Sequence, residues 1–206
     1  MIKQILNIIK KFNKISLRFD LPNSKKILQF DETHSQILRQ IIKKDFNILK
    51  VRDEKEIYFW IFIKQIIFFD FRFLTYCKNY IKYTSPKVII TFIDTNIQFY
   101  ELKNNFKDIN FISIQNGHRF ENYSMFHNKK YINSQKLKCD HIFVFNKYYV
   151  KEYKRIIKSK YHILGNFKNN IVKINKTKIN KQFLFISHFV KNDKKKIFQK
   201  KLLNFI

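Results

Sequence analysis

The chain has 206 residues, with 42 Lys and Arg against 15 Asp and Glu and a formal net charge of +27 at pH 7. This length suits one full domain and the beginning of another. The charge does not predict specific nucleic-acid binding, because Arg, the residue best suited to bidentate phosphate and base contacts, is scarce. The chain contains no Ala and only two Gly and two Pro, a skew typical of an AT-rich coding sequence that favours Lys, Asn, Ile and Phe.

The amino-terminal segment, residues 1–14, places apolar side chains at helical spacing between lysines. It predicts an amphipathic helix that either packs on its own domain or lies on an anionic membrane surface. Residues 57–74 are very apolar, but Lys64, Asp70 and Arg72 interrupt them, which disfavours a spanning helix. With no secretory signal and no disulfide framework from Cys77 and Cys139, we expect a cytoplasmic protein, with a peripheral membrane contact left open.

Strands and helices are predicted to alternate along the rest of the chain. Strands are expected at residues 26–30, 46–51, 87–93, 110–114, 141–145 and 161–164, and helices at 36–44, 54–69, 73–83, 96–106 and 146–158. Thr33 or Ser35 is expected to cap the first of these helices. Residues 119–138 read as a long loop with at most one helical turn. The alternation predicts an α/β fold with a Rossmann-like, doubly wound parallel sheet.

The chain is expected to divide into four parts. Residues 1–24 form an amino-terminal extension and residues 25–165 the Rossmann-like domain. Residues 166–181, which contain five Asn and five Lys, are predicted to be a linker. Residues 182–206 are predicted to form the first strand and helix of a second α/β domain that is truncated.

The candidate site lies where predicted strands end, because ligands of open α/β sheets bind beyond the carboxyl ends of the strands. The strongest signal is the run Gln115, Asn116, Gly117 and His118. Asn-Gly favours a positive φ and a sharp turn, and His118 could act as a base because its pKa lies near neutrality. The alternative is an ordinary turn with an exposed His.

Three further polar groups are weaker candidates. Asp94 and Asn96 follow a strand and would either bind substrate hydroxyls or cap a helix. Asp31 and His34 occupy the same kind of position after the first strand, where with Glu32 they would bind substrate, cap a helix or hold a divalent metal. Ser187 and His188 follow the predicted first strand of the second domain and would either face the ligand or lie on the surface.

Several segments together resemble the amino-terminal half of a GT-B glycosyltransferase, and more closely the bacterial surface-carbohydrate proteins related to lipopolysaccharide and capsule transferases. The resemblance covers residues 26–190 and is carried by residues 86–96, 111–119, 139–145, 163–170 and 183–189. It implies an acceptor-binding domain facing a second domain that binds a nucleotide-sugar donor, without a metal or other cofactor. No dinucleotide-binding, P-loop or α/β-hydrolase motif is present.

The function that follows is transfer of a sugar from a nucleotide donor to a carbohydrate or lipid-linked acceptor. His118 is the expected catalytic base and Asp94 the second candidate, while Asn96, Gln115 and Asn116 would orient hydroxyl groups. The chain would be inactive alone, because most of the donor domain is missing. Two alternatives are a glycerophosphate or polyol-phosphate transferase of the same fold and a non-enzymatic basic binding module.

Overall fold

A computed structural model describes residues 15–52, 55–67, 69–70, 72–119, 124–134 and 136–170. By its internal contacts the chain divides into two units, Met1–Ile171 and Val172–Ile206, and all described residues belong to the first. The predicted helix at 1–14, the strand and helix predicted within residues 182–206, and most of the predicted linker lie outside the described residues. The four-part division of the chain therefore stays a prediction.

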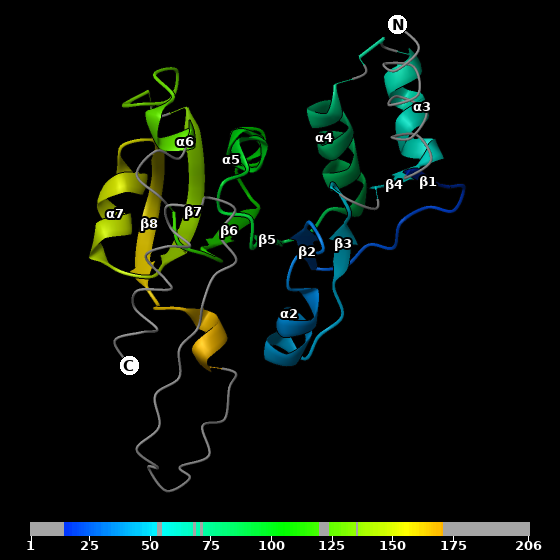
Figure 1. The fold of residues 1–206 in the computed structure, drawn as a ribbon. Helices are drawn as coiled ribbons and strands as arrows, with labels where there is room; N and C mark the ends of the chain where they lie inside the picture. The colour runs from blue at the N-terminus through cyan, green and yellow to red at the C-terminus, as the bar shows by residue number, and fades with distance from the viewer. Residues whose placement is uncertain are drawn as a thin grey trace, which may run out of the picture. The chain divides into compact units, whose positions relative to one another are not determined.

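Six parallel strands form the main sheet (Figure 1). They are β2 (Ile27–Phe30), β3 (Asn47–Leu49), β5 (Val88–Thr91), β6 (Asn110–Ile114), β7 (Leu137–Val144) and β8 (Ile157–Ile163). Their order across the sheet is β3-β2-β5-β6-β7-β8, and every neighbouring pair is parallel. The α/β fold class and the parallel sheet are confirmed.

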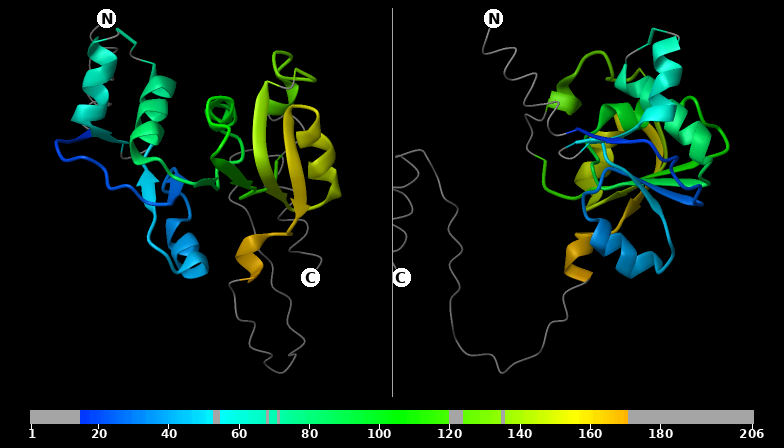
Figure 2. Two further views of the ribbon diagram at one scale, coloured as in Figure 1. Left: turned by 180° about the vertical axis from the view of Figure 1, so that it is seen from behind. Right: turned by 90° about the vertical axis from the view of Figure 1, so that its right-hand side faces the viewer.

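Helices cover both faces of this sheet (Figures 1 and 2). They are α2 (Ser35–Ile42), α3 (Phe59–Ile67), α4 (Phe73–Thr84), α5 (Ile97–Lys103), α6 (Ser124–His127), α7 (Lys147–Lys154) and the 3-10 helix η1 (Phe167–Asn170). Successive residues of a strand point to opposite faces. Ile89 therefore belongs to the large core that includes side chains of α4, α5 and α7, whereas Ile90 packs in the smaller core with Leu38 of α2 and Phe167 of η1.

The strand order places a topological switch point between β2 and β5. From β2 the chain moves outward to β3 and then returns to the other side of β2 as β5. Because all six strands are parallel, their carboxyl ends share one edge, and ligands bind at such an edge near the switch point. Asp31 follows β2, Asp94 follows β5 and His118 follows β6, so the three lie at the same end of their strands.

The predicted helix at 54–69 is wrong over its first residues. Residues Lys55–Tyr58 form a strand, β4, which pairs in parallel with β1 (Ile15–Arg18) in a separate two-stranded sheet. The N–H of Tyr58 also donates to the hydroxyl of Tyr76 on α4. These partners are distant in sequence, so local pattern alone favoured the helix, which instead begins at Phe59.

The bounds of the last strands and helix in chain order, β7, α7 and β8, also differ from the prediction. The strand predicted at 141–145 begins at Leu137, and the helix predicted to reach residue 158 ends at Lys154. Leu137 and Cys139 are buried, but the polar residues between and after them hid the strand. Ile157 and Lys158, which were predicted to end the helix, instead begin β8. Their backbone pairs with β7.

Among the described residues, no helix has the length and apolar character needed to cross a membrane.

Replacing Ile89 by Ala should lower the free energy of unfolding by about 2–5 kcal/mol, because the side chain is fully buried and leaves a cavity. Ile41 on α2 is 61% exposed, and Ile41→Ala should change it by no more than about 0.5 kcal/mol. Urea denaturation of both variants measures the difference. Equal losses would contradict the assignment of Ile89 to the core.

Candidate functional site

The loop that follows β6 is held at the sheet edge by its first residue, Gln115. Gln115 is buried, its side-chain Nε2 donates to the carbonyl of Gly117 at 2.9 Å, and its Oε1 accepts from the N–H of Phe145 at 2.9 Å. The amide therefore joins the loop after β6 to the residue that follows β7. The predicted role of Gln115 in orienting a substrate hydroxyl would require one of these bonds to open.

Gly117 does not have the positive φ expected for Asn-Gly. Of the two glycines, Gly165 is the one with a left-handed backbone, at φ 73°. A Cβ at position 117 would instead lie 3.4 Å from Nη1 of Arg119. This is close to an ordinary contact with the end of a flexible side chain, so neither the backbone conformation nor the space around Gly117 shows why a glycine stands here.

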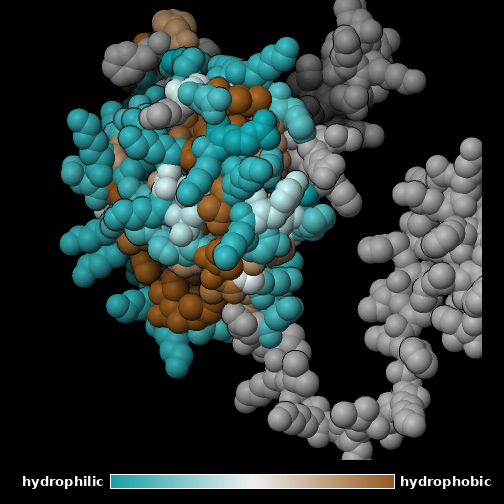
Figure 3. All heavy atoms as spheres, turned by 90° about the vertical axis from the view of Figure 1, so that its left-hand side faces the viewer, coloured by the Kyte–Doolittle hydropathy of each residue, from teal (hydrophilic) through white to brown (hydrophobic). Residues whose placement is uncertain are grey.

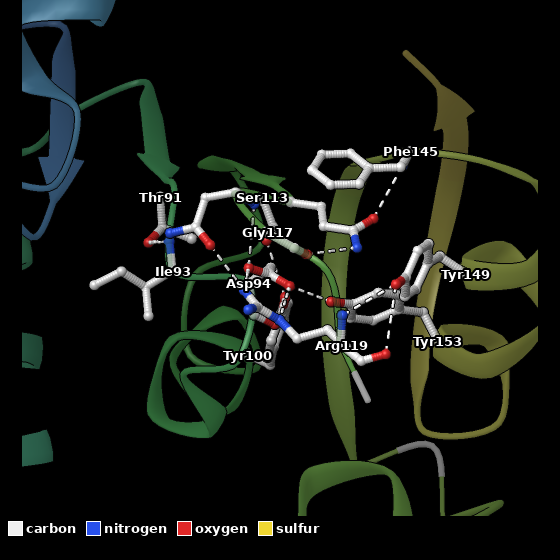
Figure 4. Close-up of polar contacts among 12 residues, drawn as sticks. Thr91, Ile93, Asp94, Tyr100, Ser113, Gly117, Arg119, Phe145, Tyr149 and Tyr153 are labelled. Atoms are coloured by element: carbon white, nitrogen blue, oxygen red, sulfur yellow. Dashed lines mark hydrogen bonds and ion pairs between the residues drawn. The ribbon is translucent and has the colours of Figure 1, made fainter. Parts of the chain in front are cut away.

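Asp94 is the centre of a buried polar network (Figure 4). Its side chain is 0% exposed, and its carboxylate accepts from both Nε and Nη2 of Arg119, with the Nε contact at 3.0 Å. It also accepts from the hydroxyl of Tyr153 on α7 and, at 3.4 Å, from the backbone N–H of Asn116. The carboxylate thus ties the end of β5 to the loop after β6 and to α7.

Arg119 was not among the predicted site residues, although it follows His118 directly. Its side chain is only 15% exposed, and burial opposes its charge, but the hydrogen bonds and the negative charge of Asp94 still raise its pKa. Its Nη2 also donates to Oδ1 of Asn116 at 2.8 Å. A buried acid after an apolar strand needs a cationic partner. Because Arg residues are scarce in this chain, an Arg directly beside the predicted site was the signal that could have identified Arg119.

Two buried tyrosines complete the network around Asp94. Tyr100 of α5 donates to the backbone carbonyl of Asp94 at 2.7 Å, and its oxygen lies 2.9 Å from Oγ of Ser113. Burial, reinforced by the charge of Asp94, raises the pKa of Tyr153 well above its ordinary value. Its hydroxyl therefore stays protonated and acts as a donor to the carboxylate.

His118 is the exposed member of this loop and the one that its neighbours orient. Its Nδ1 forms a hydrogen bond with the hydroxyl of Tyr149, a fully buried residue of α7. The same hydroxyl accepts from the backbone N–H of Arg119 at 3.0 Å and lies 3.4 Å from the carbonyl of Arg119. The ring of His118 meets that of Tyr149 edge-on, with centroids 5.8 Å apart.

Asn96 caps α5, one of the two roles expected for it. Its Oδ1 accepts from the N–H groups of Gln98 and Phe99 at 3.0 and 3.3 Å, as a helix N-cap does. Asn116 differs, because its Oδ1 accepts from Arg119 and its own N–H reaches Asp94. Both amides have structural partners and remain close to the rim.

Asp31 and His34, after β2, lie in separate surroundings. The buried carboxylate of Asp31 forms an ion pair with Arg52 at 2.8 Å and accepts from the N–H and the hydroxyl of Thr33. The prediction that Thr33 or Ser35 caps α2 is wrong, because the cap residue is His34, at φ 60° and without a side-chain cap bond. His34 instead packs edge-on against Phe92 and Phe167.

Ser187 and His188 lie outside the described residues. Within the described ranges, no group of three or more His, Cys, Asp or Glu side chains is arranged to hold a metal ion. The metal alternative for Asp31 and its neighbours therefore gains no support from the geometry, in which the Asp31 carboxylate is engaged by Arg52 and Thr33.

One protein-family model matches residues 112–204, and its description is "putative O-antigen biosynthesis protein". No curated protein matches the chain significantly, and the same is true of the solved structures. The matched segment begins inside β6 and includes the loop that carries His118 and Arg119, as well as Tyr149 and Tyr153, but not Asp94. The similarity supports a role in surface carbohydrate biosynthesis.

Replacing Asp94 by Asn should lower the free energy of unfolding by about 3–5 kcal/mol, because it leaves the charge of Arg119 largely buried without a counter-charge. The second substitution, Arg119→Gln, added to Asp94→Asn should recover part of this loss. Chemical denaturation measures both.

The matched control is Asp20→Asn, which removes another Arg–Asp pair held through both Nε and Nη2, Arg18 with Asp20, from the exposed surface. Solvent screens this pair, so no measurable change is expected. A similar loss in both variants would show that the network around Asp94 has no special weight.

Stability should fall as the pH drops below about 6.5, in part because of His34. Burial and the charge of Lys168 lower its pKa in the folded chain, so the unfolded chain binds the proton first and acid favours unfolding. The variant His34→Asn, which tolerates the left-handed backbone, should show a smaller loss between pH 7 and pH 5. An unchanged pH slope in denaturation curves would exclude this contribution.

Proposed function

We propose that the chain provides the acceptor side of a glycosyltransferase of surface polysaccharide or lipopolysaccharide biosynthesis, in which a nucleotide-sugar donor transfers its sugar to a carbohydrate or lipid-linked acceptor. The observation that carries the proposal is an exposed His, oriented by a buried Tyr hydroxyl, at the carboxyl edge of a parallel sheet. The family similarity supports the pathway, and it includes this His.

In the proposed step, His118 removes the proton from an acceptor hydroxyl as its oxygen attacks the anomeric carbon of the donor. The new bond joins the acceptor oxygen to the anomeric carbon, and the bond from that carbon to the diphosphate oxygen breaks. The nucleotide diphosphate leaves with the bonding electron pair, and the proton stays on Nε2 of His118. A second α/β domain facing this rim would hold the donor, as in the GT-B arrangement.

Tyr149 decides which nitrogen of His118 can act as the base. For Nε2 to accept a proton, Nδ1 must carry one and donate it to the hydroxyl oxygen of Tyr149. That oxygen also accepts from the N–H of Arg119, so its own proton points to the carbonyl of Arg119. In the other tautomer Nδ1 accepts from Tyr149 and Nε2 is a donor, which suits binding of an oxygen atom but not proton removal.

Asp94 has a positioning role in this proposal. Its carboxylate is fully buried and accepts from Arg119, Tyr153 and the N–H of Asn116, so an acceptor hydroxyl could reach it only after these bonds opened. The ion pair fixes the loop that carries His118. Asn96 and Asn116 remain the amides that would orient acceptor hydroxyl groups near it.

The test uses a cell extract from the source strain with the gene deleted, which supplies the acceptor and any partner protein. Purified full-length chain is added with labelled nucleotide sugars, and label in lipid-linked or polymeric carbohydrate is measured. The wild type should restore incorporation. His118→Ala should reduce the rate by about 100-fold to 10,000-fold, the range expected for loss of a general base. Tyr149→Phe should reduce it less and shift its pH profile.

Thermal unfolding of each variant separates loss of function from loss of folding. Normal incorporation by a folded His118→Ala variant would remove His118 from the mechanism. Failure of the wild-type chain to restore incorporation of any sugar would contradict glycosyl transfer itself. Restoration of phosphate-linked polyol, without any sugar, would assign the chain to polyol-phosphate transfer instead.

A further inference from the structure

An exposed apolar surface is concentrated on two segments that play no part in the candidate site. Twelve large hydrophobic residues are exposed among the described ranges. Seven of them belong to these segments: Leu17, Phe19, Leu21, Trp60, Ile66, Ile67 and Phe69. We call this set the α3 surface. The remaining five are distributed over α2, α4, α7 and the end of β8, so no other part of the described chain has such a concentration.

Specific contacts join the two segments into one surface. The indole N–H of Trp60 donates to the carbonyl of Phe19 at 2.8 Å, and the rings of Phe19 and Phe59 lie 5.4 Å apart. The parallel pairing of β1 with β4 also places residues 15–18 beside the strand that leads directly into α3. The two segments, which are distant in sequence, therefore meet at Phe19 and the first turn of α3.

The outer stripe of α3 resembles that of a helix lying at a membrane interface. Trp60, Lys64 and Ile67 follow one another at helical spacing and are all exposed, while Ile61 and Gln65 are buried against the domain. Trp is enriched at the boundary between lipid and water, and a Lys beside it can extend its ammonium group toward phosphate while its methylene groups contact apolar atoms.

Phe69, just beyond the end of α3, is the clearest anomaly. It is 84% exposed and has a left-handed backbone, at φ 50°, a conformation that a bulky residue rarely adopts. Asn tolerates this conformation better, and its codon can be as AT-rich as that of Phe, so codon bias alone does not account for a Phe here. An exposed phenyl ring kept at a conformational cost indicates an apolar partner.

The charged groups beside the α3 surface include Lys64 and two Arg–Asp ion pairs, which together leave a small local excess of positive charge. Arg18 and Arg72 have side chains that are 47% and 80% exposed, and the exposed Lys64 lies on α3 between Trp60 and Ile67. Arg18 and Arg72 pair with Asp20 and Asp70, and the whole chain carries a net charge of +27. Figure 3 shows the end of the molecule that carries α7 and β8, where hydrophilic side chains surround several apolar groups, the most prominent of them low on this face.

We propose that the α3 surface docks on an anionic lipid bilayer, with Trp60, Ile67 and Phe69 entering the boundary between headgroups and acyl chains. Apolar area and attraction to anionic headgroups together determine the strength of such binding. α3 has nine residues, too few to cross a bilayer, so it would lie in the plane of the interface. The basic net charge favours lipid over a second copy of the same chain, which would bring like charges together.

The test is sedimentation of the full-length chain with vesicles of phosphatidylcholine alone or with phosphatidylglycerol. The wild type should bind the anionic vesicles preferentially, and added salt should weaken binding. The double variant Ile67→Asn with Phe69→Asn should bind at least about tenfold more weakly, because two apolar anchors are lost. This readout is independent of transferase activity, so it can fail while the proposed function stands.

Two further double variants make the result decisive. Ile41→Asn with Tyr83→Asn removes exposed apolar side chains elsewhere, at 61% and 42% exposure, and should bind like the wild type. Ile5→Asn with Ile9→Asn tests the amino-terminal segment. The proposal is overturned if the wild type does not bind anionic vesicles or if the Ile67 and Phe69 variant binds them like the wild type. It is also overturned if the Ile5 and Ile9 variant is the only one that loses binding. If the wild type binds no vesicles but forms a dimer, and the Ile67 and Phe69 variant does not dimerise, the α3 surface is assigned to self-association instead.

Discussion

The ion pair between Asp94 and Arg119 is the interaction on which the rim of this sheet depends. A buried carboxylate is costly unless a counter-charge and hydrogen bonds replace water. Here Arg119 supplies the charge, and Tyr153 and the N–H of Asn116 supply the remaining donors. The pair joins three elements that are not adjacent in sequence, namely the end of β5, the loop after β6 and helix α7. The conformation that presents His118 is therefore set by electrostatics below the surface.

The composition of the chain explains why tyrosines surround this pair. Without Ala and with almost no Gly, the core is filled by large side chains, among them the fully buried Tyr100, Tyr149 and Tyr153. Each carries a hydroxyl group that must find a partner when buried. Their hydroxyls reach Asp94, Ser113 and the backbone and ring of the loop after β6. The packing of the core and the polar site are thus built from the same side chains.

The sequence predicted much of the fold because strand ends such as those before Asp31 and Asp94 are abrupt changes from apolar to polar residues. It failed where a distant partner decides the structure, as at Lys55–Tyr58, whose backbone pairs with β1. For the site, it identified the rim that holds Asp94 and His118 but not the buried roles of Gln115 and Asp94. Arg119 was not identified from the sequence, because spacing along the chain does not show which side chains fold back. Asp94 was interpreted as a candidate base, whereas its buried carboxylate needs a counter-ion.

The two proposals also fit together through the topology. β4 and α3 lie in the connection that leaves the carboxyl end of β3, and Arg52, three residues before β4, pairs with Asp31 at the carboxyl end of β2. The α3 surface is thus linked by a short stretch of chain to the edge of the sheet that carries His118. A lipid-linked acceptor has its reactive hydroxyl attached to an anchor that stays in the bilayer. A protein that rests on the bilayer through α3 meets such acceptors in two dimensions, at an effective concentration that free diffusion from solution does not provide.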